Sequence, residues 1–412
     1  MRHLLSTSTT APKDTVVKIA LLLPAYPSRR ILRKGRALTK SLLQTQSLAG
    51  ETVEVVVGLV PLTDVYWKEE SARFTALGER VSVRRLHWER IPFSNAKRMF
   101  FAYPRPSTGP GIDSVILPRD FGENFLDCSF WFNIADLRAG AVYGVRPMAN
   151  FLLEPTPRQV PEAFPHASAD PYWALQTEAF RSFRMTGLVV TEGESDAAEW
   201  ASYAGIRRDD VMAVGELYTP AASISTSPHH ASRLLWRVEP DPIYDFERAA
   251  AGLQRYLNEG GSMSPVLLSE LPEEGFRKGS NIPLVAGASF SVREMLHRLP
   301  YRHYCDENDI ARALATSAYV WDSAVFAMAK ALSRDALFAG LPLLSAEVPG
   351  WEASEGATFL RYRSDNAHAI ADALHELERF QPHAPALHED TLADVTVRIG
   401  FVLDRLWEMS DA

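Results

Sequence analysis

Short apolar runs alternate with helical segments along this chain, and the alternation occurs twice. Val16–Pro24 is nearly continuous in apolar residues and ends in proline, as expected for a strand buried on both faces of a parallel sheet. The pattern starts again at Leu234–Arg237. Because strands that alternate with helices form βαβ units, the sequence predicts an α/β protein with two parallel sheets.

Further strands and helices follow from the same pattern. The first half contains predicted strands at Val53–Val60, Val81–Trp88, Leu126–Ile134, Ala149–Leu153 and Thr186–Thr191, with a helix from about Arg36 to Gln46. The second half contains predicted strands at Pro265–Leu271 and Ala318–Trp321, and predicted helices at Phe246–Asn258, Ile310–Thr316, Ala367–Phe380 and Thr391–Glu408.

The domain boundaries follow from length and composition. A chain of 412 residues is too long for one ordinary core, so we expect two domains. A stretch rich in Ser, Pro and Thr separates the halves and is typical of a linker. The predicted division is a mobile N-terminus (1–15), a first domain (16–220), the linker (221–232), a second domain (233–390) and a C-terminal helix (391–412) that packs back on the first domain.

Bulk composition excludes several classes of protein. The net charge of −8 argues against a general nucleic-acid binder. Cys128 and Cys305 are the two cysteines, which predicts a reducing, cytoplasmic location and neither a disulfide framework nor a Cys/His metal site. No apolar run reaches the roughly 18–20 residues of a membrane span, and the N-terminus does not resemble a signal peptide.

The positive charge is concentrated near the N-terminus. Between Asp14 and Glu51 there is no acidic residue, and the basic residues there are Lys18, Arg29, Arg30, Arg33, Lys34, Arg36 and Lys40. Three roles are open for the segment 29–40. It could meet phosphates or an anionic acceptor in a cleft, it could form a peripheral contact with anionic lipid, or it could be a solvated basic face.

Common nucleotide and hydrolase motifs are absent. The sequence has no Gly-x-Gly-x-x-Gly after a strand, no Walker motif and no Gly-x-Ser-x-Gly elbow. It also contains no Asp-x-Asp, which favours a mechanism without a metal ion. A dinucleotide dehydrogenase is therefore disfavoured.

Residues 319–352 are the most distinctive segment. They are predicted to form a buried strand, a polar loop, a helix closed by Gly340 and a second apolar strand, with Asp335 five residues before that glycine. The run from Asp335 through Gly340-Leu-Pro-Leu-Leu-Ser345 resembles the donor-sugar segment of GT-B glycosyltransferases, Glu-Ala-x-x-x-Gly-x-Pro-Val-x-Ser. The match departs from the family at Ala327, which stands where the first Glu of the family's Glu-x7-Glu pair is expected.

The resemblance covers about residues 16–390 and implies a fold and an activity. It implies two Rossmann-like domains with an interdomain cleft, and transfer of a sugar from a nucleotide-sugar donor to a saccharide or lipid-linked acceptor, without a cofactor or a metal. The order of segments around residues 126–200 is similar to that of bacterial cell-surface rhamnosyltransferases. That similarity implies a role in surface-glycan synthesis, and the net charge of −8 separately argues against a nucleic-acid partner.

Donor-binding residues are implied in the second domain. By resemblance, Asp335 binds sugar or ribose hydroxyls, and Ser333 and Trp321 lie in the same donor segment. Arg237 would bind the diphosphate, or it could be a surface residue paired with Glu239. The Lys that usually follows about five residues later is replaced by Pro242, so Arg334 is the candidate for the second cation, with a solvated helix residue as the alternative.

Acceptor and catalytic residues are implied in the first domain. Asn133 and Asp136 follow a strand at the sheet edge where α/β proteins bind ligands. Asp136 could be a general base or orient the acceptor hydroxyl, or it could simply cap the next segment. Arg29, Arg30 and Arg33 form the expected acceptor or phosphate region.

Two other functions are compatible with this fold. The missing Glu and Lys favour a non-catalytic relative that binds a glycan or a partner protein, and a nucleotide-sugar epimerase would need a cleft too closed for a second sugar. We expect Arg237, Arg334 and Asp335 to converge on one cleft in an enzyme.

Overall fold

The first sheet has seven parallel strands in the order β3-β2-β1-β6-β7-β8-β9. The computed structural model describes residues 16–45, 51–99, 113–135, 142–152, 187–218, 232–239, 245–278, 290–325, 330–348, 359–363, 366–380 and 390–411. The strands of the first sheet are β1 (Val16–Leu22), β2 (Thr52–Leu59), β3 (Val81–Arg85), β6 (Phe130–Ala135), β7 (Met148–Leu152), β8 (Leu188–Thr191) and β9 (Val211–Ala213).

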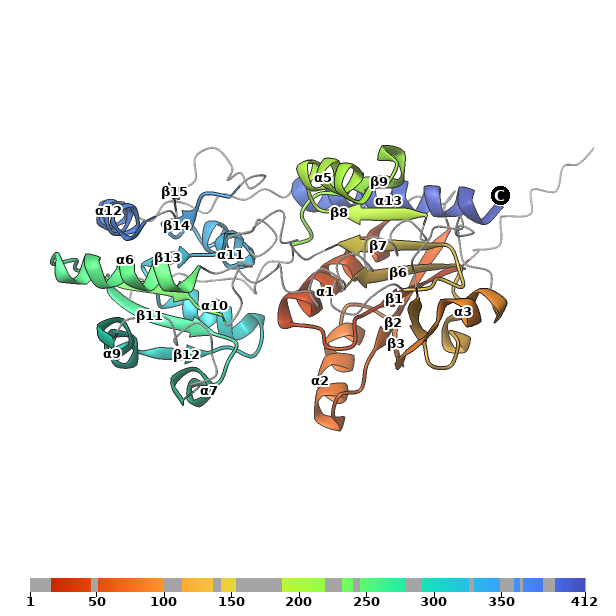
Figure 1. Ribbon diagram of the computed structural model, residues 1–412, viewed down its shortest axis with the longest axis horizontal. Helices are drawn as coiled ribbons and strands as arrows, with labels where there is room; N and C mark the ends of the chain where they lie inside the picture. Colours follow the sequence, from red (N-terminus) through yellow and green to blue (C-terminus); the bar gives the residue numbers. More distant parts are fainter. Residues whose placement is uncertain are drawn as a thin grey trace, which may run out of the picture.

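The second sheet has six parallel strands in the order β12-β11-β10-β13-β14-β15. They are β10 (Arg233–Arg237), β11 (Ser264–Ser269), β12 (Tyr301–His303), β13 (Tyr319–Asp322), β14 (Leu343–Ala346) and β15 (Phe359–Tyr362). In both sheets the strand order reverses beside the first strand, which is the doubly wound arrangement of Rossmann-like domains. The predicted fold class, two Rossmann-like α/β domains, is confirmed, and Figure 1 shows the two sheets side by side.

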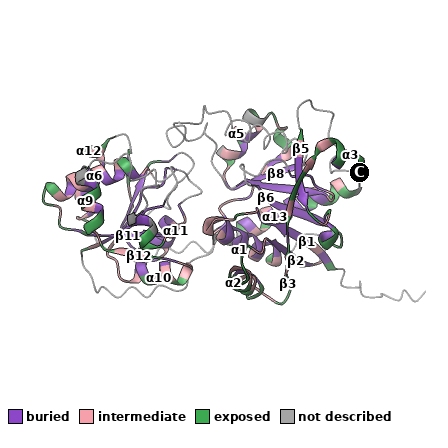
Figure 2. Ribbon diagram, turned by 60° about the horizontal axis from the view of Figure 1, so that its bottom comes forward, coloured by how far each residue is buried: buried purple, intermediate pink, exposed green. Residues whose placement is uncertain are grey.

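Helices cover these sheets. Those of the N-terminal half are α1 (Arg29–Gln44), α2 (Asp64–Thr75), α3 (Phe93–Met99) and α5 (Glu194–Ala204). Those of the C-terminal half are α6 (Phe246–Asn258), α7 (Glu273–Lys278), α9 (Phe290–Arg298), α10 (Glu307–Ala315), α11 (Ala331–Phe338), α12 (Ala367–Leu377) and α13 (Asp390–Asp411). Buried residues, purple in Figure 2, fill the sheets and the helix faces turned toward them.

Some predicted boundaries differ from the structure. The helix expected from about Arg36 begins at Arg29, because Ser28 caps it by accepting a hydrogen bond from the backbone N–H of Ile31. The strand expected at Val81–Trp88 is two strands, since Trp88 opens β4 (Trp88–Pro92), which pairs antiparallel with β5 (Ser114–Pro118). The strand expected from Leu126 begins only at Phe130.

The last helix, α13, returns to the N-terminal domain (Figure 1). Its Trp407 ring packs edge-on against Phe130 of β6 at 5.7 Å, and Val395, Ile399 and Val402 are buried in the core. The chain therefore crosses between the domains twice. In the part of the chain that the structure describes, no helix is both long and apolar enough to cross a membrane.

A test of the second-domain packing is Gly252→Ala in α6. Helix propensity alone would favour Ala by about 1 kcal/mol. An added Cβ would lie only 2.6 Å from Cβ of Ile370 on α12, however, and overpacking of this kind costs about 1–3 kcal/mol. We therefore expect a lower free energy of unfolding in urea. In an Ile370→Gly background, which removes that Cβ, the same change should cost less, and equal costs in both backgrounds would contradict the assigned contact.

Candidate functional site

A pocket lies between the two domains and encloses about 620 Å³, including the part open to solvent. Its first-domain wall comes from the beginning of α1 and from α2, and its second-domain wall from the end of β10, the turn after β12 and the beginnings of α10 and α11. The charged residues that line it are Arg29, Arg30, Arg33, Lys34, Arg36, Glu70, Arg73, Arg237, Asp306 and Glu307. The lining is therefore mainly cationic.

The basic segment that begins α1 faces this pocket. Arg29, Arg30, Arg33, Lys34 and Arg36 all line it, and each is buried or half-buried. Residues 23–27 link β1 to Ser28, which caps α1. The buried face of α1 then packs on the sheet, which turns the first basic residues toward the second domain. The segment does not present an exposed basic face for a lipid surface.

Arg33 of α1 and Asp335 of α11 form a two-pronged ion pair across the domains. The two terminal guanidinium nitrogens of Arg33 donate to the two carboxylate oxygens of Asp335 at 2.8 and 2.7 Å. Tyr218, at the end of the first domain, donates its hydroxyl to the same carboxylate at 2.6 Å. Burial and the Asp335 charge raise the pKa of the Tyr218 phenol well above its ordinary value, so this group stays a donor.

The contacts of Asp335 differ from the predicted ones, in which its carboxylate binds sugar or ribose hydroxyls. The residue lies in the middle of α11 (Ala331–Phe338). Its side chain is fully buried, and its two oxygens are held by Arg33 and Tyr218. In this conformation the carboxylate joins the domains.

Residues 216–218 are held between α1 and α11. Arg334 of α11 forms an ion pair with Glu216 at 2.5 Å. The backbone N–H of Leu217 donates to Glu192 at 2.9 Å, and Lys34 donates to the same carboxylate oxygen at 2.6 Å. Burial raises the pKa of Glu192, although the nearby Lys34 ammonium lowers it. The segment that ends the first domain is thus fixed to both domains.

Arg237 lies at the end of β10 and is anchored by a buried network. Its Nε donates to Glu239 at 3.1 Å, and its Nη2 donates to the hydroxyl of Tyr304 at 3.0 Å. Tyr304 in turn donates to Glu239 at 2.5 Å. Burial raises the pKa of Glu239 to about 7, while Arg237 acts in the opposite direction. Arg237 is therefore paired with Glu239, but it is buried and lines the pocket.

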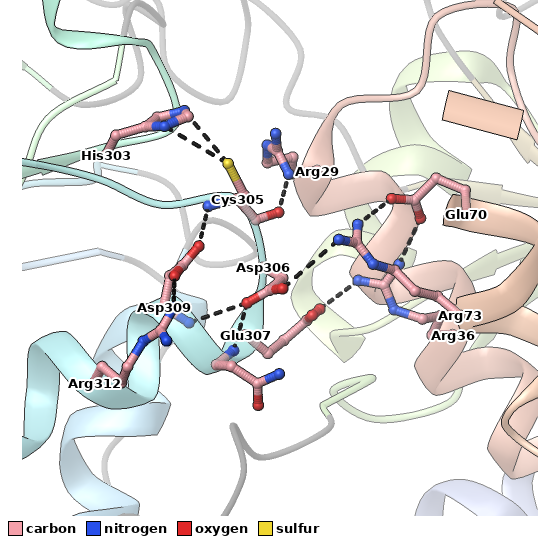
Figure 3. A network of polar contacts seen from close by, with 11 residues as sticks. Arg29, Arg36, Glu70, Arg73, His303, Cys305, Asp306, Glu307, Asp309 and Arg312 are labelled. Carbon is pink, nitrogen blue, oxygen red and sulfur yellow. Dashed lines mark hydrogen bonds and ion pairs between the residues drawn. The ribbon is translucent and has the colours of Figure 1, made fainter. Parts of the chain in front are cut away.

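Charged residues also bridge the outer edge of the pocket (Figure 3). Arg36 contacts Glu307 at the beginning of α10, and Arg73 of α2 lies 3.7 Å from Asp306. Glu70, which is buried, binds both arginines from the first-domain side. Asp306 also caps α10 by accepting from two backbone N–H groups.

The other predicted site residues that the structure describes lie away from the pocket. Asn133 is buried in β6 and donates to Asn150 of β7 at 2.7 Å, and Ser333 donates to Asp322 at 2.7 Å. Trp321 has no exposed surface and stacks on Trp236 with ring centroids 4.6 Å apart. Asp136 lies outside the described residues. The structure thus places Arg29, Arg30, Arg33 and Arg237 around one pocket and does not place Asn133, Ser333, Trp321, Arg334 or Asp335 there, so the expected convergence of Arg237, Arg334 and Asp335 on this pocket is not found.

Several pocket residues were not identified from the sequence. They are Glu70, Arg73, Tyr218 and Tyr304. Their local patterns are ordinary for helices, strand ends and linkers, and their partners are far away in sequence. The sequence contained one indication of these contacts, the run of cationic residues on α1 with no acidic residue close to it in the sequence. Such a run indicates that its acidic partners lie elsewhere in the fold.

Comparisons with solved structures identify the fold. No family model and no curated protein matches the chain. The chain is similar to a glycosyltransferase from Rickettsia africae over 95% of its length and 98% of that chain, with a TM-score of 0.56 and 9% identity. WaaG, a glycosyltransferase involved in lipopolysaccharide biosynthesis, covers 96% of this chain and 97% of its own at a TM-score of 0.52 and 12% identity.

A putative UDP-N-acetylglucosamine 2-epimerase from Listeria monocytogenes is also similar, with a TM-score of 0.52, 10% identity and coverage of 95% of this chain and 97% of that one. At such identities the likeness concerns the fold. The chain has the GT-B fold, as its sequence predicts.

The Arg33–Asp335 pair can be tested by Asp335→Asn. This change leaves the Arg33 guanidinium buried without its counter-charge, which costs about 3–5 kcal/mol. Tyr218→Phe removes one hydrogen bond to the same carboxylate and should cost only about 1–2 kcal/mol. Urea unfolding measures both variants. Equal losses would show that the hydrogen bonds, and not the charge, hold the domains together.

Glu239 predicts a pH dependence of stability. The folded protein keeps this proton up to about pH 7, whereas the unfolded chain loses it near the ordinary value of 4.5. The free energy of unfolding should therefore fall between these pH values, by up to about 3 kcal/mol. Glu239→Gln should remove this slope, while Glu294→Gln, at an exposed glutamate paired with Arg298, should keep it. Parallel pH curves for wild type and Glu239→Gln would contradict the assignment.

Proposed function

We propose that the protein is a glycosyltransferase that moves a sugar from a nucleoside-diphosphate donor to a saccharide or lipid-linked acceptor. The observation that carries this proposal is the pocket between the two Rossmann-like domains, lined by arginines from both. A bound diphosphate would supply the negative charge that complements this lining. We further propose that the product belongs to a cell-surface glycan and that the reaction is cytoplasmic.

The charge that each side chain carries indicates its role in the transfer reaction. An acceptor hydroxyl attacks the anomeric carbon of the donor sugar, the bond to the diphosphate oxygen breaks, and a base takes the hydroxyl proton. Arg237 would bind the leaving diphosphate and stabilise the charge that develops on it, so this step needs no metal ion. Asp136 remains the proposed base. Closure of the domains would exclude water from the reacting carbon.

A second candidate is a non-catalytic protein that binds a glycan or a partner. The observation in its favour is the pairing of Asp335 with Arg33 and Tyr218, since this buried carboxylate reaches no donor hydroxyl in the present conformation. In an enzyme, donor hydroxyls would have to replace these two partners when the domains part. An experiment that detects donor binding separates the two candidates.

The first measurement is thermal stabilisation by UDP, dTDP, GDP, ADP and CMP. A nucleotide present at 100 times its dissociation constant should add about 2.7 kcal/mol to the stability of the fold. We expect one nucleotide to stabilise the wild type and to lose this effect in Arg237→Met, because the cation at the pocket is removed.

Two controls make the result specific. Arg298→Met, at an exposed ion pair on α9, should respond to the nucleotide as the wild type does. Incubation with the matching nucleotide sugar should release nucleoside diphosphate only when an acceptor is present, whereas an epimerase converts the sugar alone. Stabilisation by none of the nucleotides would reject the transferase proposal in favour of the second candidate.

A further inference from the structure

A thiol and an imidazole lie together between β12 and α10 (Figure 3). The Sγ atom of Cys305 lies 3.6 Å from Nδ1 and 3.8 Å from Nε2 of His303. His303 is the last residue of β12, and Cys305, two residues on, lines the pocket between the domains. The end of this strand therefore brings a nucleophile and a base into contact at the pocket wall.

A second contact of His303 determines which ring nitrogen can accept the thiol proton. Nε2 lies 3.0 Å from the backbone carbonyl oxygen of Glu270, and a carbonyl oxygen can only accept a hydrogen bond. In the neutral ring Nε2 therefore carries the proton, which leaves the lone pair of Nδ1 for the thiol of Cys305. A base that is oriented in this way by a third group is the arrangement that activates cysteine nucleophiles.

The charges around Cys305 favour an anionic reagent. Three carboxylates follow it at the beginning of α10, and each forms an ion pair: Asp306 with Arg73, Glu307 with Arg36, and Asp309 with Arg312. Arg29 donates to the backbone carbonyl of Cys305 itself. The local negative charge is thus largely balanced, whereas the charged lining of the pocket is mainly cationic. Such a pocket attracts anionic reagents and repels cationic ones.

The other cysteine of the chain, Cys128, lies in a different environment. Its side chain is in the core with 1% of its surface exposed, and its Sγ lies 3.8 Å from a carboxylate oxygen of Asp127. Burial, and then the Asp127 charge, raise the pKa of the Cys128 thiol to about 12. Because the thiolate is the reactive form, Cys128 should be inert at neutral pH. It serves as an internal control for Cys305, which is half-buried and has a histidine beside its sulfur.

We propose that Cys305 is a modification site, at which its thiol reacts with small disulfides that carry carboxylate groups. The proton of the Cys305 thiol passes to Nδ1 of His303 as Sγ attacks one sulfur of the reagent. A new S–S bond forms, the S–S bond of the reagent breaks, and the departing thiolate takes the proton from His303. The products are a mixed disulfide on Cys305 and one free thiol, so Cys305 is oxidised and the reagent is reduced.

The mixed disulfide has a consequence for the pocket. The attached group stays at the pocket wall and occupies part of the space of about 620 Å³. It therefore competes with any other ligand of this pocket, whether or not the protein transfers sugars. Because a second thiol reverses the modification by the same exchange, access to the pocket would depend on the ratio of thiols to disulfides around the protein.

Reaction of the full chain with dithiobis(nitrobenzoate), a disulfide with a carboxylate on each ring, tests the proposal. We expect one thiol per chain to react, with release of the coloured thiolate and a mass increase on the peptide that contains Cys305. Cys305→Ser should abolish this reaction, and Cys128→Ser should leave its rate unchanged. The proposal is overturned if the wild type does not react, or if Cys128 reacts as fast as Cys305.

Two further rates test the base and the preference for carboxylates. His303→Gln should react about tenfold or more slowly at pH 7, because a general base is lost. His368→Gln, at an exposed histidine of α12 that contacts Arg255, should react as the wild type does. Added salt should slow the reaction with dithiobis(nitrobenzoate) but not with the uncharged dithiodipyridine, because salt screens the attraction between opposite charges.

Unchanged rates would contradict these two parts separately. If His303→Gln reacts as fast as the wild type, Cys305 is an unassisted thiol and the proposed site fails. If salt affects both reagents equally, the preference for carboxylates fails. Thermal melts of each variant verify that the fold is retained.

Discussion

The relation of the two domains depends on the buried pairing of Arg33 with Asp335. A bidentate contact between a guanidinium and a carboxylate fixes orientation as well as distance, which a single hydrogen bond does not. Tyr218 adds the end of the first domain to the same carboxylate. One side chain of α11 thereby sets the positions of α1 and of the segment that leads into the linker, and the walls of the pocket follow from that geometry.

The charged residues on α1 have two different roles in the structure. Those at positions 33, 34 and 36 meet carboxylates that lie elsewhere in the fold, and they hold the domains and the residues 216–218 together. Among the described residues, the polar contact of Arg29 is to the backbone carbonyl of Cys305. The excess of positive charge in this segment is therefore largely neutralised by the fold itself, and what is left faces the pocket. A basic run in a sequence does not show how much of its charge is available to a ligand.

The sequence predicted the two-sheet architecture well because strands that are buried on both faces of a sheet are nearly continuous runs of apolar residues. Val16–Leu22 and Arg233–Arg237 each begin a sheet at the expected place. Boundaries were less accurate where a capping side chain decides them, as at Ser28. The site was predicted only in part. Arg237 and the arginines of α1 have a strong local signal, whereas Tyr218 and Tyr304 act through partners that only the tertiary structure brings near. Trp321 is buried and stacks on Trp236, so an aromatic residue beside a donor motif can also fill the core.

The composition of the domain interface also bears on how a ligand could enter. An interface built from apolar side chains would expose them to water on opening, at a cost proportional to their area. Here the contacts across the pocket include Arg33–Asp335, Arg36–Glu307 and Arg73–Asp306, whose charged groups are hydrated when they separate. Hydration recovers much of the energy that the ion pairs supply, because the net gain of such pairs is small compared with their Coulomb attraction. The closed state can then be well ordered and still open at moderate cost. That balance suits a pocket whose ligand must pass between two domains.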